Sequence, residues 1–260
     1  MFFNQNTAKS PDAHLRTQLG RYIFSRQREL IFDMVKPDTG ERVLDIKCGT
    51  GNHLQLFKEK WCQITGLDPS AKSLDIAKNK LGSAADLIVG QPEDLPFSDD
   101  EFDIVTVINA LETSLNPRKV ITEAIRVCRG RVFIGFINNY SLAGTRQGLK
   151  ELFGIPISTQ SHFYSLNEIK LMVGSIITNP EIKWGSVIYF PAFVYSFFEE
   201  LEEMLPVINN PLGAFTGLVF PVKYTYRTVQ NPLIEPFNMN GKARRAAPGT
   251  ARDMLQETKK

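Results

Sequence analysis

The stretch VLDIKCGTG, residues 43–51, runs from an apolar segment into a glycine-rich turn. Asp45 lies inside the apolar segment, and Gly49 and Gly51 lie in the turn. Because glycine lacks a Cβ atom, a turn of this kind lets the backbone approach a ligand closely. Lys47 stands where the first glycine of such a turn is expected. The stretch therefore predicts a ligand-binding turn that carries an unusual cation.

Strand-like and helix-like patterns alternate on both sides of this turn. Short apolar runs predict strands, and apolar residues at helical spacing predict helices. The expected strands cover residues 42–46, 62–68, 86–89, 101–109 and 131–137, and the expected helices cover 13–35, 51–60, 69–81 and 117–128. Pro69 is expected in the first turn of its helix. This alternation predicts an α/β, doubly wound, Rossmann-like sheet that is mostly parallel, with its ligand outside the carboxyl ends of the strands.

The regular alternation of strand and helix patterns ends after Asn138. Helices are expected at 140–153 and 165–178, which would make residues 138–180 a helical cap insertion. Strands at 182–190 and 215–226, with a helix near 193–204 between them, would complete a seven-stranded sheet. Pro221 predicts that the last strand is an edge strand or contains a bulge. The expected organisation is a single domain over residues 1–230 and a polar, basic, flexible tail over 231–260.

Composition excludes several classes of protein. The 260 residues carry a net charge of +2, and 43% of them are hydrophobic, as in an ordinary globular protein. No apolar run is long enough for a membrane span, and no secretory signal is evident. The three cysteines form no CxxC pair, so no metal site is expected and a cytoplasmic location is favoured. Because the basic charge is concentrated in the tail, no nucleic-acid partner is expected. Monomer and homodimer both remain open.

The glycine turn also restricts the ligand. A dinucleotide-binding turn would need a third glycine at position 54, where Leu54 stands, and no Walker-type Gly-Lys-Ser/Thr sequence follows. Asp68 ends the second expected strand, where an acid can accept hydrogen bonds from both hydroxyls of a ribose. The spacing therefore favours an adenosine ligand without a pyrophosphate.

Four ordered segments carry a resemblance to a known family. VLDIKCGTG resembles, at all but one position, the first motif of the class I S-adenosylmethionine-dependent methyltransferases of the small-molecule type (methyltransferase domain 11-like). The segments GLDPS (66–70), EDLPFSDDEFDIV (93–105) and LNPRKVITEAIRVCRGRVFIGF (115–136) are similar to the later motifs of that family. The resemblance covers about residues 17–137. It implies S-adenosylmethionine as cofactor, S-adenosylhomocysteine as product and a small-molecule methyl acceptor.

The resemblance also implies a cofactor site. Gly49 and Gly51 would face the methionine and ribose parts, Asp68 would bind the ribose hydroxyls, and Asn109 would lie near the methyl donor. Pro92 lacks the N–H that commonly reaches adenine, so Gln91 or Glu93 would replace that contact. The full set expected at the cofactor site is Tyr22, Asp45, Lys47, Cys48, Gly49, Gly51, Asp68, Pro69, Gln91, Pro92, Glu93 and Asn109, with Cys48 interpreted as a packing residue.

Three readings of Lys47 remain open from the sequence. Its ammonium would pair with the cofactor carboxylate, or point away into solvent, or disturb a turn that needs a positive φ. Retained cofactor binding is favoured, because every other part of the cofactor frame is present.

The candidate catalytic residues are Glu112, His162 and Tyr164. Glu112 follows the fourth expected strand and would serve as a general base, although an exposed loop acid fits the sequence equally well. His162 and Tyr164 fall in the expected cap, where they are either substrate-site residues or core aromatics. The main hypothesis is an enzyme that transfers a methyl group to a small molecule. The alternative is a noncatalytic or regulatory binder of S-adenosylmethionine or S-adenosylhomocysteine.

Overall fold

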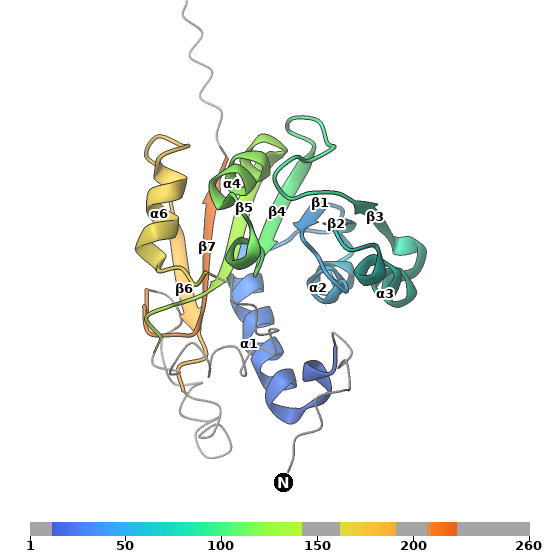
Figure 1. Ribbon diagram of the computed structural model, residues 1–260, viewed down its shortest axis with the longest axis horizontal. Coiled ribbons are helices and arrows are strands. Elements are labelled where there is room, and N and C mark those ends of the chain that lie inside the picture. The colour runs from blue at the N-terminus through green and yellow to red at the C-terminus, as the bar shows by residue number, and fades with distance from the viewer. Residues whose placement is uncertain (1–11, 142–161, 191–206, 208, 223–260) are drawn as a thin grey trace, which may run out of the picture. The chain divides into compact units, whose positions relative to one another are not determined.

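A computed structural model describes residues 12–141, 162–190, 207 and 209–222 of the chain. Seven strands form one sheet in the order β3-β2-β1-β4-β5-β7-β6 (Figure 1). Pairings among β1 to β5 are parallel, and β7 is antiparallel to both of its neighbours. The expected Rossmann-like, mostly parallel sheet is confirmed. Its strands are β1 (Arg42–Ile46), β2 (Gln63–Asp68), β3 (Ala85–Val89), β4 (Phe102–Ile108), β5 (Cys128–Ile137), β6 (Lys183–Val187) and β7 (Phe215–Pro221).

The central strands are buried on both faces, which explains their continuous apolar sequences. Val43 of β1 joins one hydrophobic cluster and Leu44 joins the other, because successive side chains point to opposite faces of a sheet. Parallel pairing places the carboxyl ends of β2, β1 and β4 side by side in that order. The turns after these three strands therefore meet at one edge of the sheet.

Helices cover both faces. The first hydrophobic cluster combines strand residues with α1, α2 and α3, and the second combines them with α4 and α6. Side chains cap the helices where the sequence offers them: Ser70 accepts from the N–H of Ser73 before α3, and Ser165 forms a capping box with Glu168 before α6. The helical elements are η1 (His14–Arg16), α1 (Gln18–Val35), α2 (Asn52–Glu59), α3 (Ala71–Leu81), η2 (Gly82–Ala84), η3 (Leu111–Thr113), α4 (Pro117–Arg126) and α6 (Leu166–Gly174).

Two local predictions are wrong. Pro221 does not mark an edge strand or a bulge, because β7 is an inner strand between β5 and β6. The proline is tolerated since it is the last residue of β7, beyond Val219, where the pairing with β6 ends. Pro69 is not in the first turn of α3, because Ser70 caps that helix and Ala71 begins it.

The predicted cap lies only partly within the described residues. Residues 142–161 lie outside them, as do the helix expected near 193–204 and the tail over 231–260. The described part, α6, packs beside α4, and Ile169 and Val173 are buried with residues of the sheet. The domain boundaries stay a prediction.

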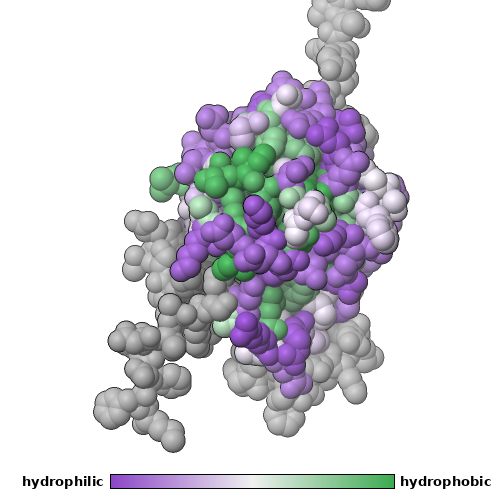
Figure 2. All heavy atoms as spheres, turned by 90° about the vertical axis from the view of Figure 1, so that its right-hand side faces the viewer, coloured by the Kyte–Doolittle hydropathy of each residue, from purple (hydrophilic) through white to green (hydrophobic). Residues whose placement is uncertain are grey.

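The face at the β3 end of the sheet is largely hydrophilic, with hydrophobic atoms gathered near its middle (Figure 2). Two large hydrophobic side chains are strongly exposed near the predicted ligand edge, Val89 at the end of β3 and Leu115 after η3. Within the described part of the chain, no helix combines the length and apolarity needed to cross a membrane.

Candidate functional site

The turn after β1 is built from left-handed backbone. Lys47, Gly49 and Gly51 have φ values of 63°, 55° and 77°. At Gly51, which caps α2, an added Cβ would come within 2.9 Å of Leu81 and 3.1 Å of Ala77. At Gly49, an added Cβ would meet no heavy atom within 4 Å. Gly51 is therefore required for packing α2 on α3, whereas Gly49 faces open space.

Asp68, at the tip of β2, ties this turn to the start of α3. Its Oδ2 accepts a hydrogen bond of 2.9 Å from the Gly49 N–H, and its Oδ1 accepts one of 2.8 Å from the Ser70 N–H. A carboxylate has about four acceptor positions, so roughly two remain for a ligand. These are the acceptors that the two hydroxyls of a ribose need.

Asp45 lies beneath the turn and is buried. Its Oδ1 accepts a hydrogen bond of 2.7 Å from the Thr106 hydroxyl of β4, and its Oδ2 has no hydrogen-bond partner among the described residues. Burial raises the pKa of Asp45 to about 7, and the charge of Asp68 acts in the same direction. Asp45 thus joins β1 to β4 and leaves one acceptor atom free.

A hollow of about 380 Å³ adjoins the turn. One wall comes from the loop after β3, which contains Glu93. Ser114, which follows η3, donates a hydrogen bond of 2.5 Å to the Glu93 carboxylate. Pro69 and Leu115 add apolar surface. The lining residues are Lys47, Pro69, Gln91, Pro92, Glu93, Ala110, Thr113, Ser114 and Leu115. Five of the residues that the sequence predicted for the cofactor site therefore line one space: Lys47, Pro69, Gln91, Pro92 and Glu93.

Lys47 extends from the tip of β1 to η3. Its Nζ donates a hydrogen bond to the Thr113 hydroxyl, and its side chain lines the hollow. Burial lowers the pKa of Lys47, while the charges of Glu112, Asp68 and Glu93 act against this lowering. The left-handed conformation, which costs a residue with a Cβ roughly 1–2 kcal/mol, is accommodated in the turn. Lys47 therefore neither points away into solvent nor breaks the turn.

Two more acceptor atoms without donors follow β4. Asn109 has a left-handed backbone (φ 52°), and its Oδ1 has no hydrogen-bond partner within the described part of the chain. Glu112 accepts a hydrogen bond of 2.9 Å from the Ile137 N–H through Oε1, while its buried Oε2 likewise has no partner there. With Asp45, these residues leave three free acceptors at the carboxyl ends of β1 and β4. Such acceptors suit a ligand that carries hydrogen-bond donors or a positive charge.

The predicted catalytic residues converge on η3. The His162 N–H donates a hydrogen bond of 2.8 Å to the Glu112 carbonyl oxygen, and the His162 and Tyr164 rings lie 4.5 Å apart in a T-shaped arrangement. Burial raises the pKa of Tyr164, and the charge of Glu112 raises it further. The structure therefore places these three residues near one another at η3, with Tyr164 buried and His162 exposed.

Two other predicted site residues lie in the core. Cys48 is buried and packs against Gly66 of β2, and burial raises the pKa of its thiol strongly. This environment agrees with a packing role rather than a nucleophilic one. Tyr22 of α1 is half-buried and packs against the first hydrophobic cluster.

A polar cluster at the glycine turn was missed by sequence reasoning. The Asp12 carboxylate accepts hydrogen bonds from Thr50 (2.7 Å), Asn52 (3.1 Å) and Lys80 (3.0 Å). These contacts fasten the segment before α1 to the turn and to α3, and they lower the pKa of Asp12. Only Thr50 lies in a recognisable motif, and no spacing rule connects residues 12 and 80.

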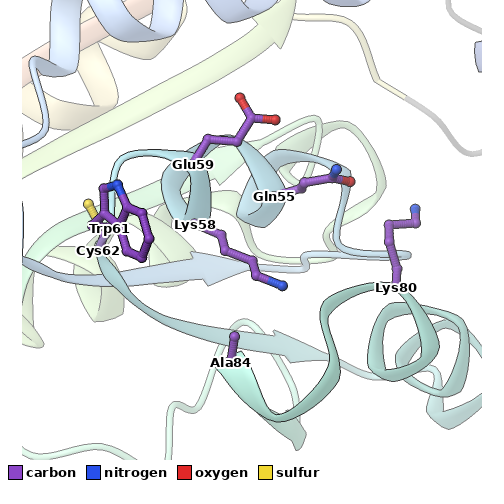
Figure 3. A pocket seen from close by; sticks show the side chains of 7 residues that line it. All are labelled: Gln55, Lys58, Glu59, Trp61, Cys62, Lys80 and Ala84. Atoms are coloured by element: carbon purple, nitrogen blue, oxygen red, sulfur yellow. The ribbon is translucent and has the colours of Figure 1, made fainter.

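A second hollow, of about 420 Å³, lies at the opposite ends of α2 and α3 (Figure 3). Trp61, Lys58 and Glu59 are among the residues that line it. Lys58 donates to the Leu81 carbonyl oxygen at 3.0 Å, and Glu59 pairs with Arg28 at 3.1 Å.

The buried acceptor atoms of Asp45, Asn109 and Glu112 that lack hydrogen-bond partners among the described residues lie at the glycine-turn edge of the sheet. The hollow beside that turn is therefore the stronger candidate for a ligand site. Among the described residues, no group of three potential metal ligands is found.

The buried carboxyl group of Glu112 should lower the free energy of unfolding as pH rises. Burial raises its pKa from the ordinary 4.5 to about 7, so the folded chain holds the proton more tightly than the unfolded chain. This stabilisation is complete below about pH 4.5 and is lost as pH rises through about 7. A shift of this size corresponds to roughly 3 kcal/mol. We expect Glu112→Gln to remove that part of the decline, measured as the free energy of unfolding in urea at pH 5 and pH 8.

The exposed acid Glu181 provides a matched control for this measurement. Glu181→Gln should leave the pH dependence of the unfolding free energy as in the wild type. Asp45 titrates in the same range, so the Glu112→Gln protein should keep part of the slope. A Glu112→Gln protein with the full wild-type slope would contradict the assigned burial effect.

Comparison with known proteins agrees with this geometry. Residues 44–134 match the family model described as a methyltransferase domain. The chain is 36% identical over 114 residues to demethylmenaquinone methyltransferase of Thermotoga maritima. This aligned region covers 42% of this chain and 49% of that protein. It is 36% identical over 105 residues to the ubiquinone biosynthesis O-methyltransferase of Dechloromonas aromatica, covering 38% and 45% of the two chains.

The likeness in fold extends further along the chain. The crystal structure of an S-adenosylmethionine-dependent methyltransferase of Thermotoga maritima, described as a possible histamine N-methyltransferase, matches with a TM-score of 0.63. The match has 20% sequence identity and covers 79% of this chain and 91% of that one. The family match over residues 44–134 and the shared fold support the resemblance to the class I S-adenosylmethionine-dependent methyltransferases that the ordered motifs predict. The chain spans about half the length of the curated relatives it matches.

Proposed function

We propose that this protein binds S-adenosylmethionine and transfers its methyl group to a small-molecule acceptor. One observation carries the proposal: Asp68 is held at the tip of β2 by the Gly49 N–H at 2.9 Å, next to the open space above Gly49 and the 380 Å³ hollow. An acid fixed in this way offers paired acceptors to a ribose, and the missing third glycine argues against a pyrophosphate. The named relatives support the same activity, since both are described as methyltransferases.

The residues present fit the cofactor. Asp68 would hold the ribose, the loop Gln91–Glu93 would border the adenine, and the free acceptors of Asp45 and Asn109 would face the methionine part. When bound, S-adenosylmethionine supplies a methyl group made electrophilic by a sulfonium. The chain supplies alignment, which accounts for a large part of the rate in reactions of two bound partners.

Glu112 is the proposed general base for an acceptor that must lose a proton. Its Oε2 is free of partners within the described residues, and burial holds its pKa at about 7, near the value at which a base works well at neutral pH. His162 and Tyr164 would contact the acceptor, because they lie against η3. We further propose that the protein works in the cytoplasm, where its three buried cysteines stay reduced.

The names of the relatives suggest which class of methyl acceptor to test first. Their names refer to demethylmenaquinone and to ubiquinone biosynthesis, so we propose phenolic or hydroquinone-like acceptors as the first class to examine. We expect methyl-labelled S-adenosylmethionine to transfer its label to such an acceptor when the full chain is present, measured by extraction and mass spectrometry. A Glu112→Gln protein should transfer at least tenfold more slowly while binding S-adenosylhomocysteine normally. Cofactor binding without transfer to any phenolic, amine or carboxylate acceptor would favour the noncatalytic alternative.

A further inference from the structure

Lys47 follows β1, the middle one of the three strands whose carboxyl ends form the proposed ligand site. The tips of β2, β1 and β4 are neighbours in that order, so a ligand reaching from Asp68 to the groups after β4 must pass the tip of β1. Lys47 is the first residue after β1, and its side chain bridges from that tip to Thr113 in η3. The ammonium therefore stands beside the path between the ribose acid and the acceptor side of the site.

The surroundings of Lys47 are acidic. Three carboxylates from three elements act on its charge: Glu112 from η3, Asp68 from β2 and Glu93 from the loop after β3. The buried Asp45 lies beneath the same turn. Without a lysine, the carboxylates of Asp68 and Glu93 would present uncompensated negative charge to a ligand, which attracts a cation in a site of low dielectric constant. With Lys47 in place, the chain itself provides the cation.

We infer that Lys47 acts as an internal counter-cation that makes this site favour the neutral thioether S-adenosylhomocysteine over the cationic sulfonium S-adenosylmethionine. The inference rests on the proposed function, because it concerns the same ligand site. The two ligands differ by one methyl group and one positive charge, so the charge at position 47 discriminates between them directly. A chain with this property retains its product after each turnover, or responds to the ratio of product to donor.

The left-handed backbone at position 47 also favours a functional role for the lysine side chain. Among residues with a Cβ, left-handed backbone is uncommon and unfavourable, and glycine would adopt it freely. Lysine at φ 63° therefore carries a conformational cost that glycine would avoid. Residues held in left-handed backbone recur at ligand sites, and Asn109 after β4 is a second one at this site.

The test is isothermal titration of the full chain with S-adenosylmethionine and with S-adenosylhomocysteine at one pH. The decisive quantity is the ratio of the two dissociation constants. We expect the wild type to bind S-adenosylhomocysteine at least tenfold more tightly. Lys47→Met keeps the length of the side chain but removes its charge, and it should tighten S-adenosylmethionine binding at least tenfold while changing S-adenosylhomocysteine binding less than threefold.

Two further variants separate charge from other effects. Lys47→Arg keeps the charge and should keep the wild-type ratio, and Lys58→Met, at the second hollow, should change neither constant. If Lys47→Met does not fold, as judged by circular dichroism, Lys47→Gln takes its place. An unchanged ratio in the neutral variant, with both ligands still bound, would overturn the role of Lys47 and leave the proposed function standing. Absence of binding of either ligand to the wild type and to the neutral variant would overturn both.

Discussion

Asp68→Asn should weaken the binding of S-adenosylhomocysteine at least 100-fold. The substitution keeps the size of the side chain but replaces one acceptor oxygen with an NH2 donor. That donor would face the N–H of Gly49 or Ser70, so one buried backbone N–H loses its partner. A hydrogen bond to a charged group contributes about 1.5–3 kcal/mol, and loss of the carboxylate affects both ribose hydroxyls. A 100-fold weakening corresponds to about 2.7 kcal/mol, near the upper end of the range for one such bond and below the sum for two.

The measurement is isothermal titration with S-adenosylhomocysteine, with the fold checked by circular dichroism. Asp86→Asn is the matched control, because Asp86 is an exposed acid on the neighbouring strand β3. The control should bind as the wild type does. A change of less than threefold in the Asp68→Asn protein would exclude Asp68 as the ribose acceptor.

Phe57→Ala should lower the free energy of unfolding by about 3–5 kcal/mol. Phe57 of α2 is completely buried in the first hydrophobic cluster, where its ring packs edge-on against Phe32 at 6.4 Å between centroids. Removing the ring leaves a cavity between α1, α2 and the sheet, which the surrounding side chains cannot fill without strain. The same loss should loosen α2, the helix that Gly51 caps.

Urea denaturation followed by circular dichroism measures this effect. The control is Trp61→Ala, four residues further along, because 79% of the Trp61 side chain is exposed. It should change the unfolding free energy by no more than about 0.5 kcal/mol. Similar losses from the two substitutions would show that α2 is not anchored through Phe57.

The sequence predicted the parallel half of the fold well, because its signals are local. Strands β1, β2, β4 and β5 are mostly buried apolar runs, and a helix of clear period follows each of β1, β2 and β4 in the chain. The predictions failed where position in the sheet decides the outcome. Pro221 marks an edge strand only if the strand lies at an edge, and strand order does not follow from the residues themselves.

The candidate site shows the same division. Gly49 and Asp68 lie in motifs of fixed spacing, so their closeness was predictable. The contact between His162 and Glu112 joins residues far apart in the chain, and it depends on how the segment after β5 returns to η3. The bridge from Lys47 to Thr113 follows from a backbone φ and a side-chain direction. Neither is encoded in a pattern of residue types.

The most direct test of the account is a crystal structure of the full chain with S-adenosylhomocysteine. We expect the ribose hydroxyls within hydrogen-bond distance of the Asp68 carboxylate, the adenine against the loop Gln91–Glu93, and the thioether over the tip of β1 beside Lys47. Density for the ligand only in the hollow bordered by Lys58 and Trp61, or a ribose that does not contact Asp68, would contradict it.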